Sequence, residues 1–340
     1  MSGRVLVVIA YFADGSVYPR AGARRSHGET YWANIAACAA TLRHVAGPTP
    51  ELVVFAGDEP PEPMAAVLAV AGGRVRHLDF ARRPPADFYE RYLGSLYVLD
   101  VMAALADEVD DDDVVLLVDP DIVWVRPIEP LVADVRAGGV VAYDLQVPED
   151  VPLCGLTRRR QTEMVAELLG VGPGPEDPAI AHFGGELYGV LGRELRDLVP
   201  VLEDLWAKAL ARHEAGLDHH NTEEHFVNVA MWVRGEQEGR ANAHLQRIRT
   251  LPKPFGTRER ATPDLVAWHL PMEKDQGLLD LFDHLAVGRS LPPADDGYVR
   301  WLGAKVGVAP RGARWLGDRA RQLKWAVTGR SWGGHPNHGL

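Results

Sequence analysis

Cysteine is scarce in this 340-residue chain, which has only Cys38 and Cys154. Two cysteines build neither a disulfide framework nor a cysteine-based zinc site, so the sequence favours a reducing compartment, the cytoplasm. Basic residues are also in deficit, because 36 Lys and Arg face 47 Asp and Glu, a formal net charge of −11. This balance argues against general nucleic-acid binding, which needs a cationic surface for phosphate contacts.

Long hydrophobic runs and several common motifs are missing too. The apolar run Val5–Phe12 is too short for a signal peptide or a spanning helix, and Asp14 follows it closely, so we predict a soluble protein. There is no Gly-x-Gly-x-x-Gly after a strand, no Gly-x-x-x-x-Gly-Lys-Ser/Thr and no Gly-x-Ser-x-Gly. Dinucleotide-binding, P-loop and α/β-hydrolase interpretations therefore lack their fingerprints.

One stretch of the chain combines a buried strand with acids. Val114–Val118 is a continuous apolar run that leads into Asp119-Pro120-Asp121, after which the apolar residues resume. A continuous run predicts a strand buried on both faces, as in a parallel sheet. Two carboxylates at the end of such a strand are costly to bury alone and suit a divalent cation with oxygen ligands. Solvated acids at a strand end are the simpler alternative.

The remaining pattern alternates strands and helices as far as about residue 145, which predicts an α/β fold with a mostly parallel central sheet and helices on both faces. The other strands are predicted at Arg4–Phe12, Glu51–Ala56, Arg74–Phe80, Gly139–Leu145, Ile180–Leu191, Arg247–Leu251 and Asp264–Leu270. Helices are predicted at Thr30–Val45, Pro63–Val70, Tyr92–Asp107 and Arg193–His213, with another that begins near Asn221 or Thr222.

Several polar clusters each allow a structural or a functional interpretation. His269 ends a late strand and is the best third ligand for a metal at Asp119 and Asp121, although it could equally be a buried histidine bonded to a carbonyl. His219, His220 and His225 could form a zinc site, which adjacent histidines seldom do. We interpret the acidic run Asp110–Asp113 as a solvated turn.

Together these residues resemble the GT-A-fold glycosyltransferases, most closely the retaining families 8 and 6, which include glycogenin and galactosyltransferases. The run that ends in Asp119-Pro120-Asp121 resembles their metal-binding Asp-x-Asp strand. Glu223–Asn228 resembles their catalytic segment, with Glu224 four residues before Asn228. His269 and Lys274 are similar to a family 8 segment in which the histidine binds metal and the lysine binds the diphosphate.

The resemblance implies a Rossmann-like GT-A sheet and a set of site residues. Asp119, Asp121 and His269 would hold Mn²⁺ or Mg²⁺, since carboxylate and imidazole ligands favour these ions, and Glu224 would act at the anomeric carbon. The nucleotide-sugar donor would contact residues that resemble the family's base, donor-sugar and diphosphate positions: Ala10, Tyr11, Phe12, Asp14, Asp144, Gly185, Glu186 and Lys274.

The implied activity is the metal-dependent transfer of a sugar, with retention, from a UDP- or GDP-sugar to a small-molecule, lipid-linked or saccharide acceptor. A sugar nucleotidyltransferase is an alternative, although the loop after the first strand lacks a convincing Gly-rich phosphate motif. A non-catalytic nucleotide-sugar-binding protein of the same fold is another.

We expect a catalytic domain over residues 1–290, a basic helical segment over 291–330 and a disordered tail over 331–340. The segment interleaves arginines with Trp301, Trp315 and Trp325. A helix that packs its Trp side on the domain and exposes its Arg side explains this pattern. Peripheral contact with the inner membrane face is the alternative.

Overall fold

The central sheet of the protein has six strands in the order β3-β2-β1-β4-β7-β6. A computed structural model describes residues 3–13, 24–172, 174, 177–248, 250, 261–309, 316 and 320. The strands of this sheet are β1 Val5–Tyr11, β2 Glu51–Ala56, β3 Gly73–His77, β4 Val114–Val118, β6 Val140–Asp144 and β7 Phe183–Leu191. Strands β3, β2, β1 and β4 pair in parallel, and β7 pairs antiparallel with both β4 and β6. The predicted mostly parallel sheet is confirmed.

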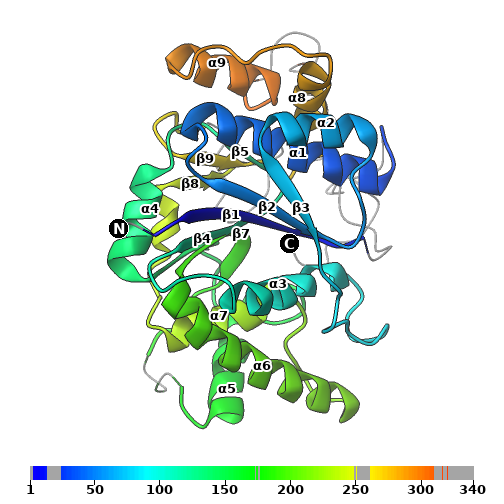
Figure 1. Cartoon of the computed structure of the whole chain (residues 1–340). Helices are drawn as coiled ribbons and strands as arrows, with labels where there is room; N and C mark the ends of the chain where they lie inside the picture. Colours follow the sequence, from blue (N-terminus) through cyan, green and yellow to red (C-terminus); the bar gives the residue numbers. More distant parts are fainter. Residues whose placement is uncertain are drawn as a thin grey trace.

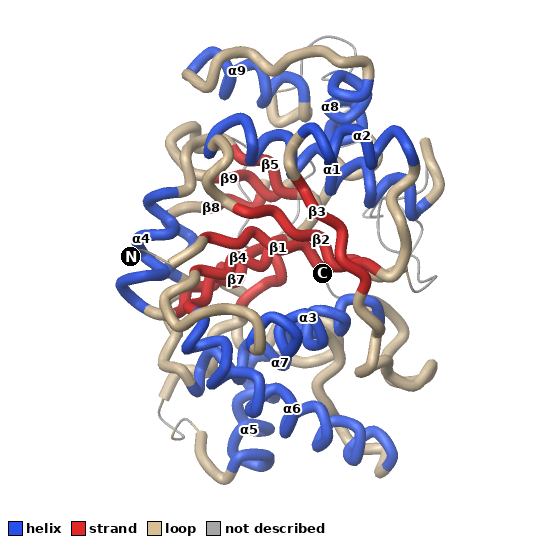
Figure 2. The backbone as a smooth tube through the Cα atoms, viewed as in Figure 1, coloured by secondary structure: helices blue, strands red, loops and turns tan. Residues whose placement is uncertain are grey.

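Helices cover both faces of the sheet (Figures 1 and 2), as predicted. Helices α1, α2 and α8 lie on one side, and α3, α6 and α7 on the other. The α-helices are α1 His27–Ala46, α2 Glu62–Val70, α3 Tyr97–Ala106, α4 Glu129–Gly138, α5 Arg158–Leu169, α6 Gly192–Glu214, α7 Glu223–Val233, α8 Gly277–Ala286 and α9 Asp296–Lys305.

The position of strand β4 between two layers of helices explains why its apolar run is continuous. Leu116 lies in the hydrophobic core on the α1 side with Ile35, and its neighbour Leu117 lies in the core on the α3 side with Met102. Successive side chains of a strand point to opposite faces, so a strand with two covered faces needs apolar residues at every position. All five residues of β4 are buried.

A second, three-stranded sheet begins directly after Asp119 and Asp121. It consists of β5 Ile122–Trp124, β9 Ala267–His269 and β8 Leu245–Arg247, with β5 antiparallel and β8 parallel to β9. The chain therefore leaves one sheet at Val118 and enters the other at Ile122 through a turn at Pro120 and Asp121. Because Ile122 is paired with His269, the turn places a distant histidine beside the two acids.

Some element boundaries differ from the prediction for local reasons. Helix α1 begins at His27 rather than Thr30, because Ser26 and Glu29 form a capping box that satisfies two backbone N–H groups. The eighth strand ends at Arg247, where the prediction has it begin. Thr222 is the N-terminal cap residue of α7, but its side chain makes no capping hydrogen bond.

The interpretation of Asp110–Asp113 as a solvated turn is wrong for Asp113, which is buried. Its Oδ1 accepts a hydrogen bond of 2.7 Å from the backbone N–H of Arg4, and its Oδ2 pairs with the Arg4 guanidinium at 2.6 Å. The other three acids are exposed. The carboxylate of Asp113 therefore anchors the start of β1 beside the start of β4.

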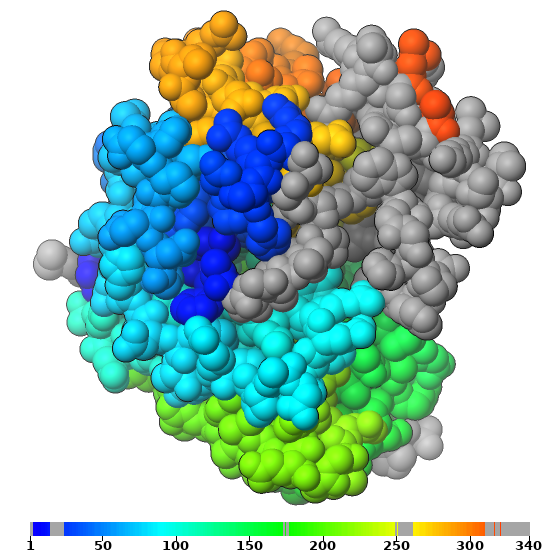
Figure 3. Space-filling model, turned by 90° about the vertical axis from the view of Figure 1, so that its right-hand side faces the viewer, coloured from blue at the N-terminus to red at the C-terminus, as the bar shows by residue number. Residues whose placement is uncertain are grey.

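Helix α9 packs on the second sheet. Tyr298 and Leu302 lie in one hydrophobic cluster with Trp268, and the Tyr298 hydroxyl donates to the Trp124 carbonyl at 2.9 Å. Helices α8 and α9 lie above α1 and α2 (Figure 1), and their surface is orange in Figure 3. The structure describes only residues 316 and 320 within 310–340, so the membrane alternative and the tail stay predictions. Across the described ranges, each helix is too short or too polar to cross a membrane.

Candidate active site

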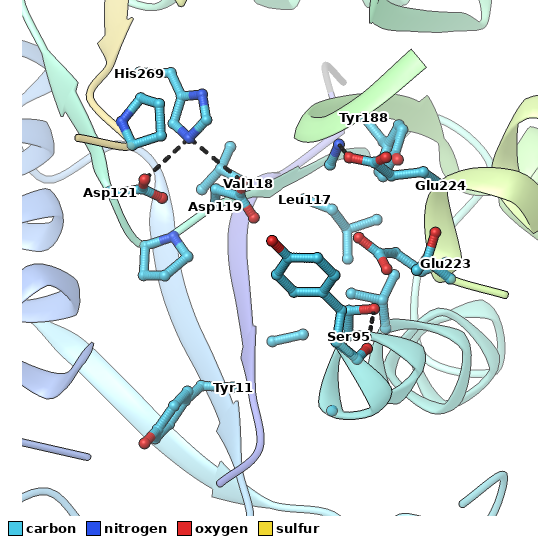
Figure 4. Close-up of a pocket in the computed structure, with 18 of the residues that line it drawn as sticks. Tyr11, Ser95, Leu117, Val118, Asp119, Asp121, Tyr188, Glu223, Glu224 and His269 are labelled. Carbon is cyan, nitrogen blue, oxygen red and sulfur yellow. Dashed lines mark hydrogen bonds and ion pairs between the residues drawn. The ribbon is translucent and has the colours of Figure 1, made fainter. Parts of the chain in front are cut away.

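A cavity of about 310 Å³ opens where the carboxyl ends of β1 and β4 meet. This is the edge of an open α/β sheet at which ligands usually bind. Residues from both sheets, from α7 and from the segment before α8 line it. Its polar lining residues are Tyr11, Tyr31, Tyr92, Ser95, Asp119, Asp121, Cys154, Tyr188, Thr222, Glu223, Glu224, Arg247, His269 and Lys274. Acids gather at two separate places in this lining (Figure 4).

The first place, which we name the aspartate end, consists of Asp119, Asp121, His269 and Lys274. One ligand atom from each of Asp119, Asp121 and His269 lies within 4.8 Å of the others, as a shared cation requires. His269 Nε2 lies 3.1 Å from Asp121 Oδ2 and 3.5 Å from Asp119 Oδ2, and Lys274 Nζ donates to Asp121 Oδ2 at 2.6 Å. The structure thus brings these four residues together although Asp119 and Lys274 are separated by 155 positions in the sequence.

Charge at the aspartate end is strongly coupled. Burial would raise the pKa of Asp121, but the Lys274 ammonium and the His269 imidazole outweigh it and lower that pKa. Burial would lower the pKa of His269, but Asp121 and Glu186 raise it to about 9. Burial and the charge of Asp121 raise the pKa of Asp119 to about 7. Asp121 therefore keeps its charge, and Asp119 is the acid that takes up a proton most readily.

Glu186, which is buried, and Arg247, which is partly buried, form a layer behind His269. Arg247 Nη1 lies 2.5 Å from Glu186 Oε1, and His269 Nδ1 lies 3.2 Å from the same oxygen. Burial would raise the pKa of Glu186, but Arg247 and His269 lower it to about 2. Glu186 itself does not line the cavity, whereas Arg247 does. The sequence prediction missed Arg247, because an arginine at the end of the short segment Leu245-Gln246-Arg247 matches no site motif.

The second place, which we name the glutamate end, consists of Glu223, Glu224, Tyr188 and Ser95. Glu224 Oε1 accepts from the Gly185 N–H at 3.2 Å, and its Oε2 lies 3.2 Å from His182 Nε2. Burial and the neighbouring Glu224 charge raise the pKa of Glu223 to about 8. Of two adjacent glutamates in the first turn of α7, one is therefore held as a hydrogen-bond acceptor and the other favours its protonated form.

Gly185 stands between the two ends of the cavity. A Cβ atom at this position would lie 3.0 Å from Glu223 Oε1 and 3.7 Å from Asp119 Oδ1. A side chain would therefore crowd the acids and occupy the space between them. Gly185 therefore lies where acidic side chains come close to the backbone of the strand, as a glycine inside a strand predicts.

The other predicted donor contacts have different outcomes. Ala10, Tyr11 and Phe12 line the cavity, and the ring of Tyr11 stacks on Tyr31 with centroids 5.4 Å apart. Asp14 lies outside the described residues. Asp144 does not line the cavity, because its carboxylate turns back to accept from the Gln146 N–H at 2.8 Å.

The zinc site considered at His219, His220 and His225, which all lie within the described ranges, is not present. In the described part of the chain, the one group with metal-ligand spacing is Asp119, Asp121 and His269. His225 already uses both ring nitrogens. Its Nδ1 accepts from the Asn221 N–H at 3.1 Å, and its Nε2 lies 3.2 Å from the Leu153 carbonyl. His225 therefore fixes the loop beside the cavity.

No family model matches the sequence, and no curated protein matches it. Among solved structures, mouse xyloside xylosyltransferase 1 in its apo form shares 12% identity at a TM-score of 0.46, over 79% of this chain and 97% of that chain. Galactosyltransferase LgtC with donor and acceptor sugar analogues shares 15% identity at a TM-score of 0.47, over 92% of this chain and 99% of that one. Likenesses this distant carry no activity over to this chain, whose function is argued from its own residues.

Proposed function

We propose that the protein is a metal-dependent glycosyltransferase that transfers a sugar from a nucleotide-sugar donor to an acceptor with retention of configuration. One observation carries this proposal. A cation-ligand triad, Asp119, Asp121 and His269, shares a single cavity with the glutamate pair Glu223 and Glu224. A donor that spans the cavity has a diphosphate, which needs positive charge, and an anomeric carbon, which needs negative charge.

The residues at the aspartate end fit a divalent ion. Asp121 Oδ1 is buried without a hydrogen-bond partner, and a buried carboxylate oxygen in that state is costly unless a ligand satisfies it. Two carboxylates and one imidazole are ligands that suit Mn²⁺ or Mg²⁺. A divalent ion held there supplies positive charge that neutralises the departing nucleoside diphosphate.

Three groups of the chain act on the donor directly in this proposal. Lys274 leaves Asp121 and binds the diphosphate, since its ammonium lies at the cavity wall and reaches the same carboxylate as the metal ligands. Tyr11 and Phe12 provide aromatic surface for the nucleoside base. Glu224 faces the anomeric carbon and stabilises or attacks its developing positive charge, both of which carboxylates do in sugar chemistry.

Thermal-shift screening tests the proposal. Nucleoside diphosphates and their sugars, with uridine and guanosine forms first, are added to the protein with and without Mn²⁺. A ligand that binds only the folded state raises the melting temperature, so the proposal expects stabilisation by a nucleotide that depends on the ion. Positive donors are then incubated with the protein and analysed for free nucleoside diphosphate. Stabilisation without any turnover would favour a non-catalytic binding protein, and no stabilisation by any nucleotide would contradict the proposal.

A further inference from the structure

Glu224 is the outer end of a row of polar side chains that runs through the protein interior. Its Oε2 lies 3.2 Å from His182 Nε2, and His182 Nδ1 lies 3.2 Å from Gln161 Nε2. Asn228 Nδ2 donates to Gln161 Oε1 at 3.1 Å, and Asn228 Oδ1 accepts from the Phe183 backbone N–H at 2.8 Å. Gln161, His182 and Asn228 are buried, so only Glu224 reaches the cavity.

The backbone N–H at Phe183 sets the direction of every hydrogen bond in this row. A backbone N–H only donates, so the oxygen of Asn228 must face it and the amide nitrogen must face Gln161. The oxygen of Gln161 therefore faces Asn228, and its amide nitrogen faces His182. If either amide were turned over, two donors would face each other at a buried position, which is costly.

The same logic fixes the tautomer of the histidine. Because Gln161 donates to Nδ1, this nitrogen is an acceptor and the imidazole proton sits on Nε2, where it is donated to Glu224. Glu224 accepts a second hydrogen bond from the Gly185 N–H. Both oxygens of the carboxylate are thus held by donors that come from the strand β7 region.

We propose that His182, oriented by Gln161 and Asn228, is a positioning residue that holds the Glu224 carboxylate in one orientation toward the donor sugar. Glu224 and Asn228 are four residues apart on α7, so one face of this helix carries both ends of the row. Helix α5 supplies Gln161, and the residue just before β7 supplies His182. The row therefore ties three elements to the orientation of one carboxylate, and its kinetic consequence rests on the proposed function.

The tautomer is tested without any activity measurement. Long-range ¹H–¹⁵N correlation spectra of histidine-labelled protein distinguish a proton on Nε2 from one on Nδ1, and the signals that vanish in His182→Gln are those of His182. The wild-type protein is expected to have the proton on Nε2. In Gln161→Glu the new carboxylate accepts at Nδ1, so a proton is expected on that nitrogen. A wild-type proton on Nδ1, or no change in Gln161→Glu, would overturn the proposal.

The positioning role is tested by kinetics on the donor that the proposed function identifies. His182→Phe is expected to lower kcat by about 10- to 100-fold with the donor KM within about twofold, since a small misplacement of a catalytic group costs this much. His182→Gln keeps a side-chain N–H donor and is expected to recover part of the loss. An unchanged kcat in His182→Phe, or a KM change that accounts for the whole effect, would contradict the role.

His220→Phe is the matched control for these variants. His220 is also buried, packs its ring 5.3 Å from that of Phe226, and makes no hydrogen bond through either ring nitrogen within the described ranges. Its replacement is expected to leave kcat unchanged. If the wild-type protein transfers no sugar from any donor, the proposed function fails, and the histidine spectra still decide whether His182 holds Glu224.

Discussion

The two ends of the cavity treat their acids in opposite ways. At the aspartate end, Lys274 and His269 contact Asp121, and in the layer behind it Arg247 contacts Glu186, so basic groups accompany the acids. At the glutamate end, Glu224 is held by a neutral backbone N–H and by His182, and Glu223 favours its protonated form. The first arrangement pairs its acids with basic groups, whereas the second holds one carboxylate by hydrogen bonds beside an acid that favours its protonated form.

This difference matches two tasks in one reaction. The ionised carboxylate of Asp121, with its unsatisfied Oδ1, is ready to bind a cation, and its basic neighbours compensate its charge before a cation binds. A single carboxylate beside a protonated neighbour is suited to a carbon that becomes positive during the reaction. Environments that push the pKa values of nearby acids apart commonly assign different roles to them.

Removal of an acid from the aspartate end should give the largest effect. Asp121→Asn is expected to lower metal-dependent turnover of a nucleotide sugar on the order of 1000-fold, because one ligand and one compensating charge are lost together. The measurement is release of nucleoside diphosphate over a range of Mn²⁺ concentrations. Asp100→Asn is the control, since Asp100 is also a buried aspartate with a basic partner, in its case Arg82 at 2.5 Å, and lies away from the cavity. Equal losses in both variants would show that the effect is structural.

At the glutamate end, Glu224→Gln should give the next largest effect. Turnover is expected to fall on the order of 100-fold, because the amide keeps the shape but not the charge that faces the anomeric carbon. Affinity for the nucleoside diphosphate, measured by calorimetry with Mn²⁺, should stay near that of the wild type. A loss of nucleotide binding would instead place Glu224 in a structural role.

The layer behind the aspartate end should affect stability. Arg247→Met leaves the buried Glu186 charge with His269 as its remaining basic neighbour and is expected to lower the free energy of unfolding by about 3 kcal/mol. Urea unfolding measures this change. The double variant with Glu186→Gln should recover much of the loss, because the stranded charge is gone. If the two changes simply add, the ion pair does not carry the effect.

The smallest effect concerns Glu223 and depends on pH. Its pKa is raised from 4.5 to about 8 in the folded protein, so the folded chain binds more protons than the unfolded chain between these values. Stability therefore falls as the pH rises through this window. Glu223→Gln removes the titration and should melt about 2 °C higher than the wild type at pH 8. The difference should shrink toward pH 5.

Glu214→Gln serves as the control for this measurement, because Glu214 is exposed at the end of α6. It should shift the melting temperature equally at both values of pH. A pH-independent shift in Glu223→Gln as well would show that burial does not perturb that acid.

Much of the fold could be predicted because its signals are local. The continuous apolar run before Asp119 predicts a strand with two covered faces, and all residues of β4 are buried as predicted. The change of sheet after Val118 could not be predicted, since Ile122–Trp124 is as apolar as the strand before it and only the pairing with β9 distinguishes them. Ser26 and Glu29 carried a capping signal that the prediction overlooked.

The site residues likewise fall into those that the sequence indicates and those that only the tertiary structure brings together. Asp119, Asp121 and Glu224 lie in motifs that a sequence displays, and His269 follows from its place at the end of a strand. Arg247 lies in no motif, because its role depends on the register of the small sheet, which is a tertiary property. The row from Glu224 to Asn228 is hidden for the same reason, since Gln161 lies on a helix distant in sequence.

The central claim is that Asp119, Asp121 and His269 share one divalent cation beside Glu224. Electron paramagnetic resonance tests it most directly, since the signal of free Mn²⁺ declines as the ion binds. With a nucleoside diphosphate that stabilises the protein, the account predicts one bound Mn²⁺ per chain in the wild type and in Glu224→Gln, and none in Asp121→Asn. Equal binding by Asp121→Asn, or no binding by the wild type, would contradict it.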